Sequence, residues 1–234
     1  MSRFSYRNKK DTTTIGAKTH PFSKMPLFKT IQPNPETTIL VWKISESYDE
    51  FISQINLNSK SLNRLQNMKS ELHQRGFLSI RKLLETAGYS DFDLSYDLSG
   101  KPHLDDNKFI SISHSNQFSA IIISNQKVGI DIEKQREKII TIADKFALEQ
   151  LNKEFTQNYI QKLTIIWGAK EAIFKIENQK GISFKDHILL QNFEIENQNA
   201  IAILNFEGNT KNFDVQFIEI EDFTLVWVFE GSSN

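Results

Sequence analysis

The sequence contains no cysteine among its 234 residues. Disulfides, thiolate nucleophiles, cysteine-ligated zinc and iron–sulfur clusters are therefore excluded. It also lacks an apolar run of about 18 residues, so it predicts no membrane-spanning helix. Residues 1–20 are basic and polar, without the apolar segment of a secretory signal. These absences favour a cytoplasmic protein whose chemistry depends on oxygen and nitrogen groups.

Net charge is nearly absent too, because 28 Lys and Arg oppose 29 Asp and Glu to give −1. This balance argues against a protein that binds nucleic acid through global positive charge, and against a polybasic membrane anchor. Charged residues form 24% of the chain and hydrophobic residues 39%, which is typical of a globular protein. The length fits one large domain or two smaller ones.

Proline is scarce, and four of the five prolines lie between Pro21 and Pro35, after a polar stretch. We expect residues 1–24 to form a mobile tail and residues 25–37 an extended lead-in. Everything that resembles a folded pattern therefore begins near the end of this proline cluster.

The rest of the chain alternates between strand-like and helix-like patterns. Ser47 is expected to cap a helix, with Glu50 completing a capping box. The predicted helices cover 48–55, 60–86, 141–153 and 156–179, and the predicted strands cover 38–44, 94–97, 109–113, 118–124, 128–133, 188–195, 200–206 and one or two segments within 213–229.

The order of these elements predicts an α+β fold built from two α/β halves. We place the N-terminal half over residues 25–118 and the C-terminal half over residues 119–234. The strands over 118–124 and 128–133 are expected to pair around the turn residues Asn125 and Gln126.

The segment from Val128 to Glu133 carries the strongest chemical signal. Side chains alternate in a strand, so Asp131 and Glu133 share one face and the isoleucines share the other. Two carboxylates whose Cα atoms lie about 7 Å apart repel each other unless a cation lies between them. The alternative is a solvated strand face near a turn.

A second signal lies in the helical segment from Trp167 to Lys175. Glu171 and Lys175 are four residues apart, so they share a helix face. The alternative is an ordinary ion pair that stabilises the helix by about 0.2–0.5 kcal/mol.

A third cluster, from Ser111 to Ser115 with Ser113 and His114 inside it, ends a predicted strand with hydroxyls and an imidazole, groups that suit phosphate oxygens. The alternative is a structural histidine. An acidic, oxygen-only set such as Asp131, Glu133 and Glu171 suits Mg²⁺, which is usually held by one or two carboxylates and substrate phosphates. Together the three clusters indicate a metal-assisted reaction at a phosphate or pyrophosphate.

This combination resembles the signature of the 4′-phosphopantetheinyl transferase superfamily. The two signature segments are 129–133 and 167–175, two further blocks match at 100–104 and 112–115, and a looser match covers 75–81. The chain length resembles the larger, monomeric type named after the surfactin-synthetase activator (Sfp). That resemblance implies a pseudo-twofold pair of halves with coenzyme A in the cleft between them.

The resemblance implies transfer of the 4′-phosphopantetheine arm of coenzyme A to a serine of an apo acyl or peptidyl carrier protein, with release of 3′,5′-ADP. It implies a Mg²⁺-dependent holo-[acyl-carrier-protein] synthase that acts as a cytoplasmic monomer, without nucleic-acid or membrane partners. The implied metal ligands are Asp131, Glu133 and Glu171, the implied catalytic residues are Glu171, Lys175 and His114, and the implied coenzyme A contacts are Arg75, Arg81, Lys101, Ser113, His114 and Lys175.

Two other functions compete with this interpretation. A metal-dependent nuclease would need a glutamate, one residue and then a lysine on a strand, whereas Glu133 is followed directly by Lys134. A non-catalytic module that binds coenzyme A or a carrier would be free to lose its acidic residues, yet all of them are present.

Overall fold

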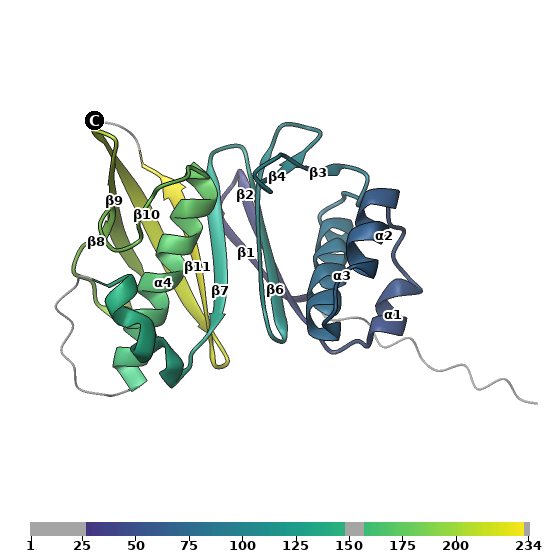
Figure 1. The fold of residues 1–234 in the computed structure, drawn as a ribbon, viewed down its shortest axis with the longest axis horizontal. Helices are drawn as coiled ribbons and strands as arrows, with labels where there is room; N and C mark the ends of the chain where they lie inside the picture. The colour runs from purple at the N-terminus through teal and green to yellow at the C-terminus, as the bar shows by residue number, and fades with distance from the viewer. Residues whose placement is uncertain (1–26, 148–156, 232–234) are drawn as a thin grey trace, which may run out of the picture.

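The computed structural model describes residues 27–147 and 157–231. The tail expected over 1–24, and the end of the helix expected over 141–153, lie outside these residues. The described chain forms four layers: a group of helices, two antiparallel sheets, and one long helix (Figure 1). The mixed α+β class is confirmed. Within the described residues, no helix combines the length and the apolar character needed to cross a membrane.

The first sheet has the strand order β1-β2-β6-β5. Leu40 and Trp42 of β2 face the helices, while Ile39 and Val41 face the second sheet, as strand alternation requires. Three helices cover its outer face (Figure 1). The elements of this half are β1 (Leu27–Asn34), β2 (Thr37–Lys43), α1 (Tyr48–Ile52), α2 (Ser59–Gln66), α3 (Glu71–Thr86), β3 (Leu94–Tyr96), β4 (Pro102–Leu104), β5 (Phe109–Ser115) and β6 (Phe118–Ser124).

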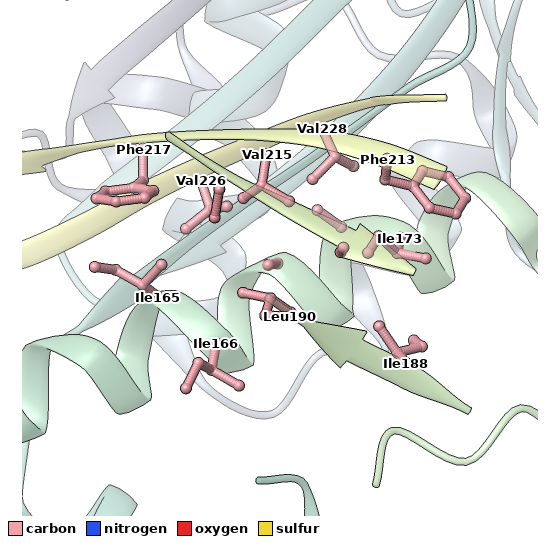
Figure 2. Packing of buried hydrophobic residues seen from close by; sticks show 14 of the residues in the cluster. Ile165, Ile166, Ile173, Ile188, Leu190, Phe213, Val215, Phe217, Val226 and Val228 are labelled. Atoms are coloured by element: carbon pink, nitrogen blue, oxygen red, sulfur yellow. The ribbon is translucent and has the colours of Figure 1, made fainter. Parts of the chain in front are cut away.

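The second sheet has the strand order β7-β11-β10-β9-β8. Val226 and Val228 of β11 pack against the long helix α4, together with Val215 (Figure 2). Leu225 and Trp227 face the first sheet. The elements are β7 (Val128–Lys134), the 3₁₀ helix η1 (Glu137–Lys145), α4 (Gln157–Glu177), β8 (Ile188–Leu190), the 3₁₀ turn η2 (Ile195–Asn197), β9 (Asn199–Phe206), β10 (Asn209–Ile220) and β11 (Phe223–Glu230).

The capping box at Ser47 and Glu50 is confirmed, since each side chain accepts from the other's main-chain N–H. The prediction of a single helix over residues 60–86 is wrong. The helix is broken between α2 and α3, where the side-chain amide of Asn67 donates to the carbonyl of Asn63 and that of Gln74 donates to the carbonyl of Met68. These polar side chains satisfy the main chain at the break, which hydrophobic periodicity does not register.

The expected pairing of β6 with β7 is also wrong. The hairpin partner of β6 is β5, and the turn between them uses Asn116 in the left-handed region, where asparagine is tolerated. Residues 125–127 instead carry the chain from the first sheet to the second, so the passage between sheets follows β6 rather than preceding it at residue 118. β7 pairs with β11.

Two smaller differences concern the C-terminal half: residues 141–145 of the helix expected over 141–153 belong to the 3₁₀ helix η1, and the strand expected over 188–195 ends at Leu190. Of the two alternatives for 213–229, the structure has two strands, which meet at a turn after Ile220. The pseudo-twofold relation between the halves stays a prediction.

Candidate active site

The site forms where β7 lies directly beneath α4, and a glycine makes that approach feasible. A Cβ added to Gly129 would lie 2.0 Å from the carbonyl oxygen of Ala172. No side chain fits there, so only glycine lets the strand approach the helix this closely. Asp131 follows on the same strand face, and Glu171 precedes Ala172 on the helix. The close approach therefore sets the acidic strand face beside Glu171.

Asp131 is 4% exposed and its two carboxylate oxygens have different surroundings. Its Oδ1 accepts hydrogen bonds of 2.8 Å from Ser113 Oγ and 2.8 Å from Lys175 Nζ. Its Oδ2 is buried and accepts no hydrogen bond from the part of the chain that the structure describes. A buried carboxylate oxygen without a donor is costly, so this atom favours an additional cation.

The other two carboxylates show the same need for positive charge. Burial, followed by the negative charge of Asp131, raises the pKa of Glu133 to about 7. Burial and Asp131 also raise the pKa of Glu171, and the ammonium of Lys175 offsets part of both effects. The raised pKa values mean that one cation does not balance the three carboxylates.

The fit to a metal ion rests on this donor set. Across residues 27–147 and 157–231, no three acidic or histidine side chains are already gathered into a metal-binding group. Asp131 is instead paired with Lys175. The unsatisfied Oδ2, the two raised pKa values and the exclusively oxygen donors nevertheless suit a hard divalent cation such as Mg²⁺.

The two lysines of the α4 signature segment point to different places. Lys175 lies over β7, where its ammonium also donates a 2.8 Å hydrogen bond to the carbonyl of Ile130. Lys170 is fully buried and donates to the main-chain carbonyls of Phe146 and Phe184. Lys170 therefore fixes the helix to the segments around it, while Lys175 belongs to the site.

A cavity of about 520 Å³ lies next to Lys175, although none of the three carboxylates lines it. Its walls come from α2, α3, β5, the segment between β3 and β4, and the C-terminal end of α4. Lys175 lines this cavity and contacts Asp131, so the cavity and the acidic strand share one cation. The other basic side chains in its walls are Arg64, His73, Arg81, Lys101 and His114.

The basic groups of the cavity are held in place by identifiable contacts. Lys101 donates to the carbonyl of Ile176 at the end of α4, and burial lowers its pKa. Arg64 lies over the rings of Phe77 and Tyr96, at 5.6 and 5.1 Å from their centroids. These contacts orient side chains that a solvated surface would leave mobile.

His114 projects from β5 into this cavity, with its ring against Gly76, whose added Cβ would lie 3.0 Å from the imidazole Nδ1. Its surroundings lower its pKa, first through burial and then through the positive charges of His73, Lys175 and Arg64. The same positive charges attract anionic oxygens, so this end of the cavity suits phosphate groups.

Three predicted coenzyme A contacts have their polar atoms bound to other protein groups. Arg81 reaches the cavity wall, but it is 2% exposed and its guanidinium is bound to Asp91 at 2.9 Å and to Ser61 at 3.3 Å. Arg75 donates 2.6 Å to the carbonyl of Glu46. Ser113 points to Asp131 rather than into the cavity. This geometry disfavours direct phosphate contact by all three.

Sequence reasoning missed several residues that the structure brings to the cavity, namely Arg64, His73, Tyr96, Phe174 and Asn178. Arg64 and His73 sit on the two helices that the sequence predicts as one, so their convergence depends on the break between α2 and α3. The sequence held one further signal, which concerns the acidic strand and not these cavity residues. Serines at 111, 113 and 115 alternate in step with the acidic residues at 131 and 133.

Residues 127–228 match the 4′-phosphopantetheinyl transferase superfamily, and this range contains Asp131, Glu133, Glu171 and Lys175. A curated relative, the 4′-phosphopantetheinyl transferase gsp of Aneurinibacillus migulanus, is 35% identical over 80 residues. That stretch covers 32% of this chain and 34% of the relative, so the match spans about a third of the relative's length.

Proposed function

We propose that the chain, whose residues 127–228 match the 4′-phosphopantetheinyl transferase superfamily, is a member of it and transfers the 4′-phosphopantetheine arm of coenzyme A to a serine of an apo acyl or peptidyl carrier protein. One observation carries this proposal: Lys175 lines a cavity with basic walls and also contacts the buried carboxylate of Asp131, whose Oδ2 has no donor among the described residues. Such a site can hold a pyrophosphate between fixed positive groups and a metal ion.

Asp131, Glu133 and Glu171 would hold Mg²⁺. Asp131 Oδ2 supplies an oxygen that has no other partner within the described chain, and Glu133 and Glu171 supply carboxylates that an added cation would stabilise in their charged form. When bound, Mg²⁺ neutralises pyrophosphate charge and makes the phosphorus more open to attack.

Lys101, His114 and Lys175 hold the phosphate oxygens of coenzyme A in this proposal. All three line the cavity, and hydrogen bonds hold Lys101 and Lys175 in place, so these two lose little side-chain freedom on binding. Arg64 and His73 add positive charge to the same cavity. Arg75 and Arg81 support the fold around it through the contacts described above.

The chemical step uses the groups that lie between α4 and β7. Glu171 accepts the proton of the carrier serine, as a carboxylate held in the charged form beside the strand that carries Asp131. The serine oxygen bonds to the β-phosphorus of coenzyme A as the bond to the departing phosphate oxygen breaks, and 3′,5′-ADP leaves. Lys175 offsets the negative charge that develops, and His114 holds a phosphate oxygen in place.

The proposal also includes action as a cytoplasmic monomer.

The direct test is incubation of the protein with coenzyme A, Mg²⁺ and an apo carrier, followed by intact mass measurement of the carrier. We expect a gain equal to one phosphopantetheine arm, and no gain in the presence of EDTA. Carriers of fatty-acid, polyketide and peptide synthesis should be tried in parallel. Binding of coenzyme A without a mass gain on any carrier would favour the non-catalytic module instead.

A further inference from the structure

The outer edge of β7 is satisfied by side chains rather than by a strand. β5 and β7 are edge strands of different sheets. Ser111 Oγ accepts a 3.1 Å hydrogen bond from the N–H of Ile130, and Ser113 Oγ accepts one of 3.3 Å from the N–H of Ile132. Exposed strand edges need such partners, so the serines of β5 join the two sheets along this seam.

Two of the three serines on this face of β5 also contact a carboxylate. Ser113 Oγ donates 2.8 Å to Asp131 Oδ1, and Ser115 Oγ donates 3.1 Å to Glu133 Oε2. Ser111 and Ser113 thus make matched contacts with the main chain of β7, as acceptors, but only Ser113 also binds an acidic side chain. Both serines are buried.

The direction of the Ser113 hydroxyl proton is fixed by its two contacts. The N–H of Ile132 must donate, so Ser113 Oγ accepts there, and its own proton is directed to Asp131. Together with Lys175, this hydroxyl occupies Oδ1, and Oδ2 is left as a buried oxygen that has no donor in residues 27–147 and 157–231. The hydroxyl therefore fixes which oxygen of Asp131 remains available to a cation.

We propose that Ser113 and Ser115 are positioning residues that orient Asp131 and Glu133 for a divalent cation, while Ser111 holds only the strand. This inference rests on the proposed function, because it presumes that these carboxylates bind a metal. Side chains that orient metal ligands commonly change metal affinity about 10–100-fold when they are removed. The assignment gives Ser113 a role in the metal site rather than in direct phosphate binding.

The test measures Mn²⁺ binding to the full chain without coenzyme A, by isothermal titration and by electron paramagnetic resonance of free Mn²⁺. We expect Ser113→Ala and Ser115→Ala to weaken binding about 10-fold, and Ser111→Ala to leave it unchanged. Ser113→Thr keeps the hydroxyl and should restore affinity. Thermal unfolding should show similar decreases in Tm for Ser111→Ala and Ser113→Ala, because each removes one hydroxyl acceptor for a main-chain N–H of β7.

The outcomes separate this inference from the proposed function. If the wild-type protein and Asp131→Ala bind Mn²⁺ equally, the metal assignment fails, and this inference fails with it. If the wild type binds at Asp131 but Ser113→Ala and Ser115→Ala bind as tightly, only the positioning role is overturned. Equal weakening by Ser111→Ala and Ser113→Ala would also overturn it, since the effect would then come from the seam. Should Ser113→Ala not fold, Ser115→Ala and Ser113→Thr decide.

Discussion

The acidic edge formed by Asp131, Glu133 and Glu171 and the basic wall of the cavity are built in opposite ways. The acidic edge comes from two elements, β7 and α4, packed so closely that only Gly129 fits between them. The basic wall comes from α2, α3, β5 and the segment leading into β4, which are separated along the chain. The difference shows that the acidic edge depends on one close contact between two short segments, whereas the basic wall depends on the convergence of several elements.

The two regions also differ in how their charges are balanced. The acidic edge holds three carboxylates with an unsatisfied oxygen and raised pKa values. Several basic groups of the wall are instead fixed on aromatic rings or main-chain carbonyls. One region is therefore short of positive charge and the other supplies it, and Lys175 stands between them.

The largest expected effect is a loss of stability, and it distinguishes Arg81, which has a framework role in supporting the wall of the cavity, from Arg64, which lines the cavity. Arg81→Ala leaves the carboxylate of Asp91 buried without its ion-pair partner, and should lower the free energy of unfolding by about 3–5 kcal/mol. Urea unfolding measures this. Arg64→Ala is the matched control, because Arg64 is less enclosed and should cost far less stability. A loss below about 1 kcal/mol, as for a surface ion pair, would contradict the framework role.

The next effect concerns the acidic edge. Asp131→Ala removes the unsatisfied Oδ2 and leaves Lys175 without its carboxylate partner. Transfer to a carrier should fall by about 100–1000-fold, the range found when one preorganised electrostatic group is lost from an active site. Initial rates measured by carrier mass give the value, and circular dichroism confirms that the fold is kept. Transfer at the wild-type rate would rule out this carboxylate as a ligand.

The third effect tests why the edge is so compact. Gly129→Ala places a Cβ against the main-chain carbonyl of Ala172, which cannot turn aside, so we expect a loss of about 1–3 kcal/mol in unfolding free energy. Gly168→Ala meets Cγ2 of Val226 at 2.8 Å, a longer approach than the 2.0 Å at Gly129 and to a side chain rather than to the main chain. Chemical denaturation of both variants should therefore show a smaller loss for Gly168→Ala. Equal losses would mean that the strand and helix adjust freely.

The smallest effect concerns the basic wall. Arg64→Ala removes one cation from the cavity and should raise the KM for coenzyme A about 10-fold, with little change in kcat, because one charge-assisted contact contributes about 1.5 kcal/mol. Steady-state kinetics with varied coenzyme A measure this. A fall in kcat at unchanged KM would place Arg64 in the chemical step instead of in binding.

The sequence alone predicts the local half of this account well. Alternation predicted the shared face of Asp131 and Glu133, and a capping pattern predicted the start of α1. Both depend on residues a few positions apart, whose geometry is set by the main chain itself. Hence the acidic edge was the part of the site that residue spacing could describe.

The assembled half could not be predicted in the same way. The break between α2 and α3 depends on polar side chains that fold back onto the main chain, and it decides where Arg64 lies. The partner of β7 depends on burial of both its faces, which a turn-like Asn125–Gln126 does not reveal. Arg81 is predicted as a phosphate ligand because the sequence does not show its buried ion-pair partner. That partner, Asp91, is recognised only once the loop after α3 is placed.

The central claim is that the acidic edge and the basic wall act on one ligand, and linkage between metal and coenzyme A tests it most directly. The Kd of coenzyme A is measured by isothermal titration with and without Mg²⁺, for the wild type and for Asp131→Ala. We predict that Mg²⁺ tightens coenzyme A binding by about 10-fold in the wild type, a coupling of ordinary size, and has no effect in the variant. Identical affinity with and without Mg²⁺ in the wild-type protein would contradict a single shared site.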